Sequence, residues 1–415
     1  MPLKVTIVGA GLGGLAAAIA LTKAGHDVEV FEKSSFHSEV GAAIHLAPNA
    51  TRVLSALGFD MKTMDPVPCD HLSFWDHKGN FIATPAVTEN LQKQLDIKDE
   101  WVLVHRADLH NALRAKAEES FDGKKLKIHL DSSVDSVDPQ TGTVILANGR
   151  LVQADLVIGA DGVHSRTVNF VTDEPQKKRS TGQNCFRFLI STEKLQANPL
   201  TKQLIDRIGL RSLNAFCDPQ RRLVLYPCRS GTLMNSVMFH PETACEDISE
   251  SSWANSGNQA KLMAEVESFG PELRELCSMA EDLKLWSLAS RDPAPYFYKG
   301  KLALIGDAAH PTLPHQGQGG AQAFEDAATL GALFTADTTP EQVNQRLKIF
   351  NEVRYEKAVT VLFMSRVGDQ HREEVMSDLK KFIPGAELPD NMWLYAWNSF
   401  PVKEAERALA SEARP

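Results

Sequence analysis

The chain has few cysteines, and none of them is spaced as in a metal or redox site. Its six cysteines are scattered, with no C-x-x-C pair, so neither a zinc ribbon nor a redox-active dithiol is expected. The thirteen histidines show no H-E-x-x-H or similar ligand spacing. We therefore expect no metal, and we expect buried free thiols in a reducing, cytoplasmic setting.

Long apolar runs and an excess of positive charge are missing too. No run of about 18 apolar residues occurs, so no membrane-spanning helix is expected. The net charge is −9, from 53 acidic and 44 basic residues, which argues against nucleic acid or an anionic membrane as a partner. Because a glycine motif begins almost at Met1, we expect no signal or transit peptide. With 415 residues, the chain can form two or three domains.

The N-terminal glycine motif predicts a dinucleotide-binding unit. Residues 5–8 are typical of a strand, and Gly9, Gly11 and Gly14 follow at G-x-G-x-x-G spacing before an apolar helix. We expect Gly9 to allow the sharp turn, Gly11 to let a pyrophosphate approach, and Gly14 to let the helix contact the strand. The N–H groups that begin the helix favour phosphates. Glu32 ends the next strand, where a carboxylate accepts hydrogen bonds from ribose hydroxyls.

Two loops beside this unit carry residues suited to a cofactor. Gly41 and Ala43 lie in a glycine-alanine loop that we expect to lead directly into the next helix. Asp108 is expected to cap a helix over 109–117. Arg106 would then stand just outside that helix, where it can meet a phosphate or a flavin.

Two apolar strands are expected to end in an acidic turn. Residues 154–159 precede Asp161-Gly162, and residues 302–305 precede Gly306-Asp307. Glycine at a strand end lets a ligand approach the backbone, and the Asp can accept hydrogen bonds from sugar or ribityl hydroxyls. Both turns are therefore expected to contact a cofactor.

The stretch after Pro311 predicts a helix N-terminus at the same site. Gly317, Gly319 and Gly320 open a helix that is expected to run to Leu333. Its N-terminal amides would face a developing negative charge, such as that on a reduced isoalloxazine.

Together these motifs resemble those of the single-component FAD-dependent aromatic hydroxylases, the group A flavoprotein monooxygenases of the 4-hydroxybenzoate and salicylate hydroxylase kind. The chain is most similar to the salicylate-hydroxylase-like branch, through segments 41–50, 185–190, 225–229 and 313–320. The resemblance covers most of the chain. It implies an α/β fold with a Rossmann-like FAD-binding domain of the glutathione-reductase type, a β-sheet-based substrate domain and a helical C-terminal region.

The FAD-binding domain is expected to be discontinuous. Short apolar segments punctuated by Gly, Pro or Asn predict the strands of the substrate domain between its parts. The expected limits are 1–70, 100–175 and 285–345 for the FAD-binding domain, 71–99 and 176–284 for the substrate domain, and 346–415 for the C-terminal region.

The resemblance also implies roles for these residues. It places Glu32 at the adenosine ribose, Arg106 at the pyrophosphate and Asp307 at the ribityl chain. The loop after Pro311 would cradle the flavin, and the Asp161-Gly162 turn would serve both FAD and the reduced nicotinamide. Gly9, Gly11, Gly14, Lys33, Gly41, Ala43, Gly317, Gly319 and Gly320 complete the expected cofactor-binding set.

The implied activity is hydroxylation of a phenolic or hydroxybenzoate-type ring, with NADPH or NADH, O₂ and a flavin C4a-hydroperoxide. Loss of a carboxylate can accompany it, as in salicylate or 4-hydroxybenzoate 1-hydroxylation. An epoxidase or a heterocycle hydroxylase of secondary metabolism is an alternative on the same fold. A non-catalytic binding module of the dissociation-inhibitor type is a remote one, against which the intact Gly306-Asp307 pair argues. A monomer and a homodimer are both compatible with the sequence.

Four residues are candidates for the catalytic site. Arg187 is a cation between aromatics in an apolar strand, where burial requires a partner such as a phenolate or carboxylate. Tyr226 lies at a strand end, and the resemblance places a substrate-anchoring Arg and Tyr at these two positions. An internal ion pair for Arg187 and a core position for Tyr226 are the alternative. His45 is expected beside the isoalloxazine, either in contact with substrate or satisfied within its loop. Pro311 is rigid, lacks an N–H and lies near the site of oxygen attack in the family.

Overall fold

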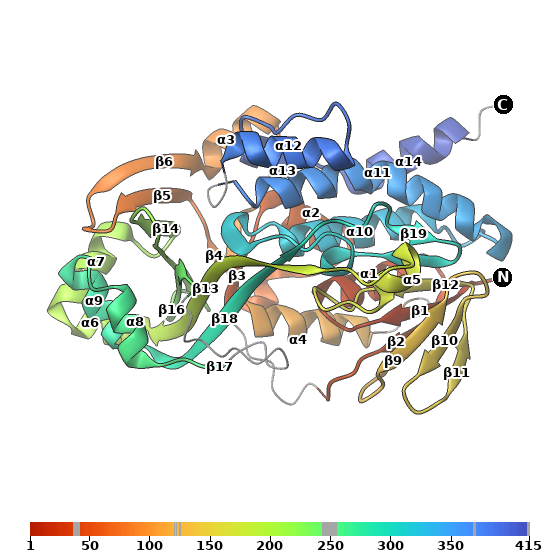
Figure 1. Cartoon of the computed structure of the whole chain (residues 1–415), viewed down its shortest axis with the longest axis horizontal. Helices are drawn as coiled ribbons and strands as arrows, with labels where there is room; N and C mark the ends of the chain where they lie inside the picture. The colour runs from red at the N-terminus through yellow and green to blue at the C-terminus, as the bar shows by residue number, and fades with distance from the viewer. Residues whose placement is uncertain are drawn as a thin grey trace.

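A computed structural model describes residues 1–35, 42–119, 121, 123, 126–242, 255–367 and 371–412. Gly41, one of the expected cofactor residues, lies outside the described residues. Figure 1 shows a lobe built on a long sheet at one end of the molecule and a parallel sheet with its helices at the other. The last helices of the chain lie along one side of the second lobe.

A mostly parallel sheet brings the expected cofactor turns to one edge. Its strands are β1 (Lys4–Val8), β2 (Asp27–Phe31), β8 (Lys127–His129), β12 (Leu156–Gly159), β19 (Tyr298–Lys299) and β20 (Leu302–Leu304). The order is β19-β20-β12-β1-β2-β8, and β19 alone of the six runs antiparallel to its neighbour. Because β1, β12 and β20 are parallel, their carboxyl ends meet, as do the turns that follow them.

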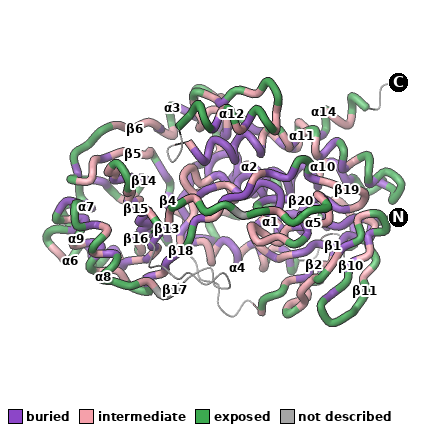
Figure 2. The backbone as a smooth tube through the Cα atoms, in the orientation of Figure 1, coloured by how far each residue is buried: buried purple, intermediate pink, exposed green. Residues whose placement is uncertain are grey.

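Small residues let two buried helices approach each other closely beside this sheet. They are α1 (Leu12–Lys23) and α10 (Gly319–Leu333). A Cβ added at Gly331 would lie 2.9 Å from the Cβ of Ala20, and one at Gly13 would lie 3.0 Å from that of Ala323. Both helices are largely buried, as the purple centre of Figure 2 shows. Larger side chains at these contacts would push the helices apart.

A small antiparallel sheet corrects the expectation that the segment after Gly41 leads directly into a helix. Residues 43–46 form a strand first, because each of them pairs with a residue of 102–105. The sheet contains β3 (Ala43–Leu46), β4 (Val67–Pro68) and β7 (Val102–His105). The adjoining helices are α2 (Pro48–Ala56), η1 (Met61–Met64), α3 (Thr88–Leu95) and α4 (Arg106–Ala117). A third sheet contains β9 (Val134–Asp138), β10 (Thr143–Leu146) and β11 (Leu151–Gln153), and α5 (Thr167–Thr172) follows β12.

An eight-stranded sheet, β17-β18-β13-β16-β15-β14-β5-β6, forms the other lobe. Alternate residues such as Phe186 and Phe188 pack under four short helices on one face, so the other face is left for the parallel-sheet lobe. The strands are β5 (His71–Asp76), β6 (Phe81–Val87), β13 (Lys178–Ser191), β14 (Ser212–Cys217), β15 (Arg222–Cys228), β16 (Leu233–Pro241), β17 (Asn255–Ser256) and β18 (Glu281–Arg291). The helices are α6 (Thr192–Ala197), α7 (Pro199–Ile208), α8 (Gln259–Glu265) and α9 (Pro271–Ser278).

The remaining elements are mostly helical. They are η2 (Gly306–Ala308), η3 (Pro314–Gln316), η4 (Pro340–Gln342), α11 (Val343–Met364), α12 (Arg372–Phe382), α13 (Met392–Trp397) and α14 (Pro401–Glu412). None of the helices in the described ranges is both long and apolar enough to cross a membrane.

The architecture is the expected α/β one, with a parallel sheet, a second β-sheet lobe and a helical C-terminal region. We propose that the chain is divided into domains at the limits expected from the sequence. The strands of the large sheet come from 71–87, 178–241 and 255–291, so β18 continues past the expected limit at residue 284.

A network of buried charges joins α2, α10 and α11. The Arg354 guanidinium donates to Asp326 at 2.8 Å and to Glu325 at 2.6 Å, and all three side chains are fully buried. His310 bonds to Asp326 at 2.7 Å, and Asn49 donates to Glu325 at 2.6 Å. Although burial raises it, the charges of His310 and Arg354 hold the pKa of Asp326 below its usual value. Because these charges are buried away from water, their ion pairs and hydrogen bonds to one another replace the hydration that they lose on folding.

We expect Arg354→Met to lower the free energy of unfolding by about 3–5 kcal/mol, because it removes the guanidinium that neutralises two buried carboxylates. Lys348→Met is the control on the same helix, where the half-exposed ammonium is 3.7 Å from Glu352. It should change stability by less than about 1 kcal/mol. Urea denaturation followed by circular dichroism measures both. Equal losses in the two variants would contradict the role given to the network.

Candidate functional site

The glycine turn after β1 has the packing that its motif predicts. Gly9 has a φ of +101°, and a Cβ there would lie 2.6 Å from the carbonyl oxygen of Ala160. A Cβ at Gly14 would overlap the carbonyl oxygen of Gly9. A Cβ at Gly11 would meet no described atom within 4 Å. Packing therefore requires Gly9 and Gly14, while Gly11 leaves open space at the start of α1.

The carboxylate of Glu32 is held against this turn. Its Oε2 accepts from the N–H of Ala10 at 2.8 Å, and its Oε1 accepts from the N–H of Ser34 at 2.8 Å. Each oxygen keeps a further lone pair for a hydroxyl. Lys33, which lies between Glu32 and Ser34 in the sequence, is exposed. The arrangement presents an oriented carboxylate beside the N-terminus of α1.

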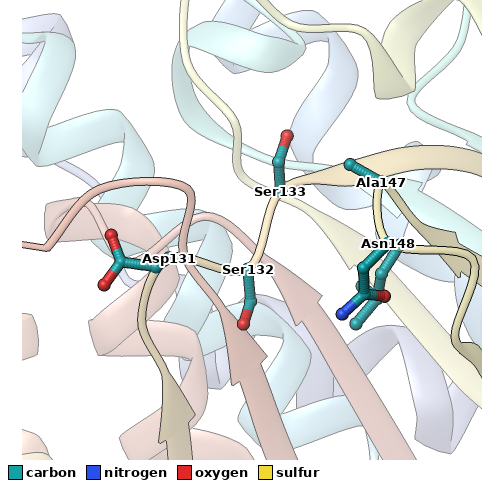
Figure 3. Close-up of a pocket in the computed structure, with 6 residues that line it drawn as sticks. Asp131, Ser132, Ser133, Ala147 and Asn148 are labelled. Atoms are coloured by element: carbon teal, nitrogen blue, oxygen red, sulfur yellow. The ribbon is translucent and has the colours of Figure 1, made fainter.

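A pocket of about 300 Å³ lies next to Glu32. The N–H of Ser132 donates to the carbonyl oxygen of Glu32 at 2.8 Å, which places the pocket beside that residue. Figure 3 shows one wall along the loop after β8 and the other on the turn between β10 and β11. The lining residues are Asp131, Ser132, Ser133, Leu146, Ala147 and Asn148. The hollow can accommodate the base end of a dinucleotide whose ribose meets Glu32.

The Asp161-Gly162 turn offers its main chain rather than its carboxylate. The Asp161 carboxylate accepts from the hydroxyls of Ser165 at 2.7 Å and Thr167 at 2.5 Å, and from the N–H groups of Arg166 at 2.7 Å and Thr167 at 3.0 Å. These bonds cap the start of α5. Gly162 has a φ of +78°, with no described atom within 4 Å of an added Cβ. A ligand can therefore approach the backbone here.

Asp307 lies among the groups expected to hold the other end of the cofactor. Desolvation by the surrounding protein raises the pKa of the Asp307 carboxyl, although the charges of His310, Arg291 and Arg106 oppose this. A Cβ on Gly319 would lie 3.8 Å from its Oδ1. The structure thus brings Asp307, Arg106 and the start of α10 together.

Arg106 does not stand outside its helix, and Asp108 does not cap it. The helix begins at Arg106 itself, with His105 before it as the N-cap residue. The Asp108 carboxylate instead accepts two hydrogen bonds, each 2.7 Å long, from the guanidinium of Arg229. A charge-assisted bidentate pair is stronger than one bond to a helix N–H, so the carboxylate turns toward the arginine.

The loop that contains Pro311 leads to an open helix end. Pro311 is buried, and Gly317 adopts a left-handed conformation with a φ of +59°. In the part of the chain that the structure describes, no side chain caps the N-terminus of α10. A Cβ on Gly320 would lie 3.2 Å from Ile44 of β3. The first N–H groups of α10 can therefore stabilise negative charge beside β3.

His45 joins this loop to β3 as a neutral imidazole. Its Nδ1 accepts the indole N–H of Trp101 at 3.1 Å, and the ring also bonds to the backbone of Gln316. A Cβ on Gly317 would overlap the imidazole. Burial lowers the pKa of His45 to about 4, while the bond to Gln316 raises it. His45 is therefore hydrogen-bonded to Trp101 and Gln316 within the protein, and a contact with substrate stays a prediction.

Three rows of side chains cross the large sheet on the face toward these loops. The rows are Tyr226–Asn235–Leu189, Val224–Val237–Arg187–Lys284 and Arg222–Phe239–Cys185–Trp286. The first row contacts β3 through Ala43, and the third contacts the η3 loop through His315. His45 connects β3 with the η3 loop. The middle row, which contains Arg187, therefore lies between the contact to β3 and the contact to the η3 loop.

Arg187 is the cation of the middle row that lies beside Val237. Its guanidinium lies 5.3 Å from the ring of Trp286. Its Nε is buried and has no hydrogen-bond partner among the described residues. An unpaired buried donor is costly, and an anionic oxygen would remove that cost.

Tyr226 and Asn235 hold the main chain of Ala43. The Tyr226 hydroxyl donates to the carbonyl oxygen of Ala43 at 2.8 Å, and the N–H of Ala43 donates to Asn235 Oδ1 at 3.0 Å. Burial raises the pKa of Tyr226 well above its usual value, while the charge of Arg187 lowers it. The phenol therefore keeps its proton at neutral pH and donates it to Ala43.

Sequence reasoning missed Arg291, which supports the Asp307 turn from below. Its guanidinium donates to the carbonyl oxygens of Asp307 at 2.9 Å and Ala308 at 2.7 Å. Burial lowers the pKa of Arg291 to about 10, against the charges of Asp307 and Asp161. The signal was present, because Arg291 is a cation at the end of a strand, as Arg187 is within one.

Comparisons with known proteins agree with this geometry. The family model described as FAD binding domain matches residues 2–362. The FAD-dependent monooxygenase cfoG of Aspergillus candidus is 34% identical, covering 99% of this chain and 95% of that protein. The hispidin-3-hydroxylase of Neonothopanus nambi is 31% identical, covering 99% and 97%. A salicylate hydroxylase–substrate complex superposes with a TM-score of 0.76 at 22% identity over 98% of both chains, which confirms the expected fold.

The residues present fit FAD. Gly11 and Gly162 leave open space where a cofactor backbone would pass. Glu32 presents two oriented oxygens, and the N-termini of α1 and α10 have no side-chain cap in the described ranges. These are the groups that ribose hydroxyls, a pyrophosphate and an electron-rich ring require.

We expect Glu32→Ala to raise the dissociation constant of FAD about tenfold or more, because charge-assisted bonds to hydroxyls are lost. Glu29→Ala is the control on β2, the strand that Glu32 directly follows, and its carboxylate bonds to Lys127 and His129. It should leave FAD affinity within about twofold. Ultrafiltration of the yellow protein measures both. Equal FAD retention in the two variants would remove Glu32 from the site.

We expect His45 to make stability depend on pH between its folded pKa of about 4 and its ordinary value of 6.5. In this window the unfolded chain binds a proton that the folded chain does not, so stability falls as pH falls. From pH 7 to pH 5, His45→Gln should lose about 2 kcal/mol less than the wild type. His371→Gln, at an exposed position, is the control. Parallel pH profiles for wild type and His45→Gln would show that His45 is not held neutral.

Proposed function

The chain belongs to the family of FAD-dependent monooxygenases, and on that premise we propose that it hydroxylates a phenolic or hydroxybenzoate-type ring with NADPH or NADH and O₂. Bound FAD supplies the redox chemistry and the activation of O₂. The residues of the chain bind the cofactor, orient the ring and hold its charge. Loss of a carboxylate during hydroxylation is part of the proposal where the substrate carries one at the reacting carbon.

The observation that carries the proposal is the buried Nε of Arg187, which has no hydrogen-bond partner among the described residues. It lies beside Val224 and Val237, which we call the apolar floor. Val224 and Val237 share its row, so a flat ring can lie on the floor while its oxygen meets the guanidinium. A phenolate or carboxylate fits this donor. A charge-assisted bond to a phenolate oxygen keeps that oxygen anionic, and an anionic oxygen raises the electron density of the ring.

Tyr226 complements Arg187 in the proposal. Its proton is committed to Ala43, so toward a substrate its oxygen can only accept. We propose that it accepts from a second hydroxyl of the ring. His45 and Pro311 then border the ring from the cofactor side, and the Asp161-Gly162 turn is the proposed meeting point with the reduced nicotinamide. The buried thiols, Cys185 among them, fit a reducing cytoplasm as the proposed location.

The test is NADPH and NADH oxidation by the purified yellow protein against a panel of phenols and hydroxybenzoates. Product and CO₂ are followed together. Ring-stimulated oxidation with a hydroxylated product is the expected result, and CO₂ would assign attack at the carbon that bears the carboxylate. A yellow protein that oxidises the nicotinamide only with alkenes or nitrogen heterocycles would overturn the phenol proposal.

We expect Arg187→Met to keep FAD bound and to lower kcat/KM for the ring about 50- to 100-fold, which corresponds to the loss of one charge-assisted bond. Lys284→Met is the matched control, because it removes the next cation in the same row. That side chain pairs with Asp282 at 2.6 Å. Steady-state kinetics measure both variants. Full turnover in Arg187→Met would place the ring elsewhere.

A further inference from the structure

We propose that β15 is a positioning strand that holds three cofactor-side segments in register with Arg187. Its residues Arg222, Tyr226 and Arg229, the last directly after the strand, each contact a different one of these segments. The inference concerns how the cofactor site is assembled, and it does not depend on which ring is hydroxylated.

The first contact fixes the η3 loop. The Arg222 guanidinium hydrogen-bonds to Nδ1 of His315 and lies 4.9 Å from the centre of the Phe239 ring. The His315 imidazole lies 5.2 Å from the same ring. The loop therefore rests on β15 and β16 directly before Gly317 and the open end of α10.

The second contact fixes β3. Tyr226 donates to the carbonyl oxygen of Ala43, and Asn235, its partner across β16, accepts from the N–H of Ala43. Both main-chain groups of one residue are held by one cross-strand pair. Ile44 and His45 follow at once, and they contact Gly320 and Gly317.

The third contact fixes the start of α4. Arg229 donates two bonds of 2.7 Å to Asp108, and its backbone adopts a left-handed φ of +49°. That conformation is uncommon outside glycine and costs of order 1 kcal/mol, so it needs a compensating contact. Asp108 lies in the same helical turn as Arg106, which places Arg106 relative to the sheet.

One strand can set these positions together because its geometry is fixed. Arg222 and Tyr226 are four residues apart and share a face, which separates them by about 13 Å. Val224 lies between them and pairs with Val237, which pairs with Arg187. Strand β15 therefore sets both the spacing of the three segments and their distance from Arg187. In this scheme Arg222, Tyr226 and Arg229 act through other groups as positioning residues.

The test compares two bidentate pairs of the same chemistry. Arg229→Ala removes the pair that reaches α4. Arg211→Ala removes a pair to Asp70, with two bonds of 2.8 Å, that lies beside the large sheet. Among the described residues, neither side chain is hydrogen-bonded to any of the three segments. The dissociation constant of FAD and the visible circular dichroism of the bound flavin are measured for both. Arg229→Asp combined with Asp108→Arg tests rescue.

We expect Arg229→Ala to raise the FAD dissociation constant about five- to tenfold and to change the flavin dichroism. Arg211→Ala should stay within about twofold with an unchanged spectrum. In the double variant, Arg229→Asp with Asp108→Arg, the logarithm of the FAD dissociation constant should return at least halfway to the wild-type value. If Arg229→Ala does not fold, Arg229→Lys gives the same comparison with an expected two- to fivefold loss.

Equal FAD affinities and spectra for the Arg229 and Arg211 variants would overturn the proposal, and so would an exchanged pair no better than Arg229→Ala alone. These readouts need no aromatic substrate. Failure of the proposed hydroxylation would appear in the product assay while the FAD measurements stayed as expected.

Discussion

The close approach of α1 to α10 is the constraint on which the site depends. Gly13 and Gly306 both lie so near Ala323 that an added Cβ would be 3.0–3.1 Å from its Cβ. This contact sets the first turn of α1, the end of β20 and the first turns of α10 side by side. Two helix N-termini then open at one edge of the parallel sheet, and a ligand with a phosphate at one end and an electron-rich ring at the other can reach both.

The large sheet adds what the parallel sheet lacks. The parallel-sheet edge offers main-chain donors and two carboxylates, whereas the face of the large sheet offers apolar side chains and the Arg187 cation. The two surfaces are joined by named contacts, such as Tyr226 with Ala43 and Arg229 with Asp108. In the proposed function, a cofactor on the first surface and a ring on the second would face each other across these contacts.

Local pattern was sufficient to predict the fold and the packing of the glycine turn after β1. Gly9, Gly14 and Glu32 were predictable because their roles depend on spacing within one strand–helix–strand unit. The start of α4 was not, because the Asp108 carboxylate pairs with Arg229, 121 residues away. The buried Arg354 network escaped for the same reason, since helical periodicity does not show which charges a fold will bring together. Long-range pairing of side chains was the information that the sequence alone did not contain.

The most direct measurement is a crystal structure of the protein with FAD bound. We expect the adenine in the pocket beside Glu32, the pyrophosphate at the start of α1, and the flavin ring beside β3 and the η3 loop, facing Arg187. An isoalloxazine in that position would support every step from the glycine turn to the apolar floor. A flavin bound with its ring remote from the middle row of the large sheet would contradict the account.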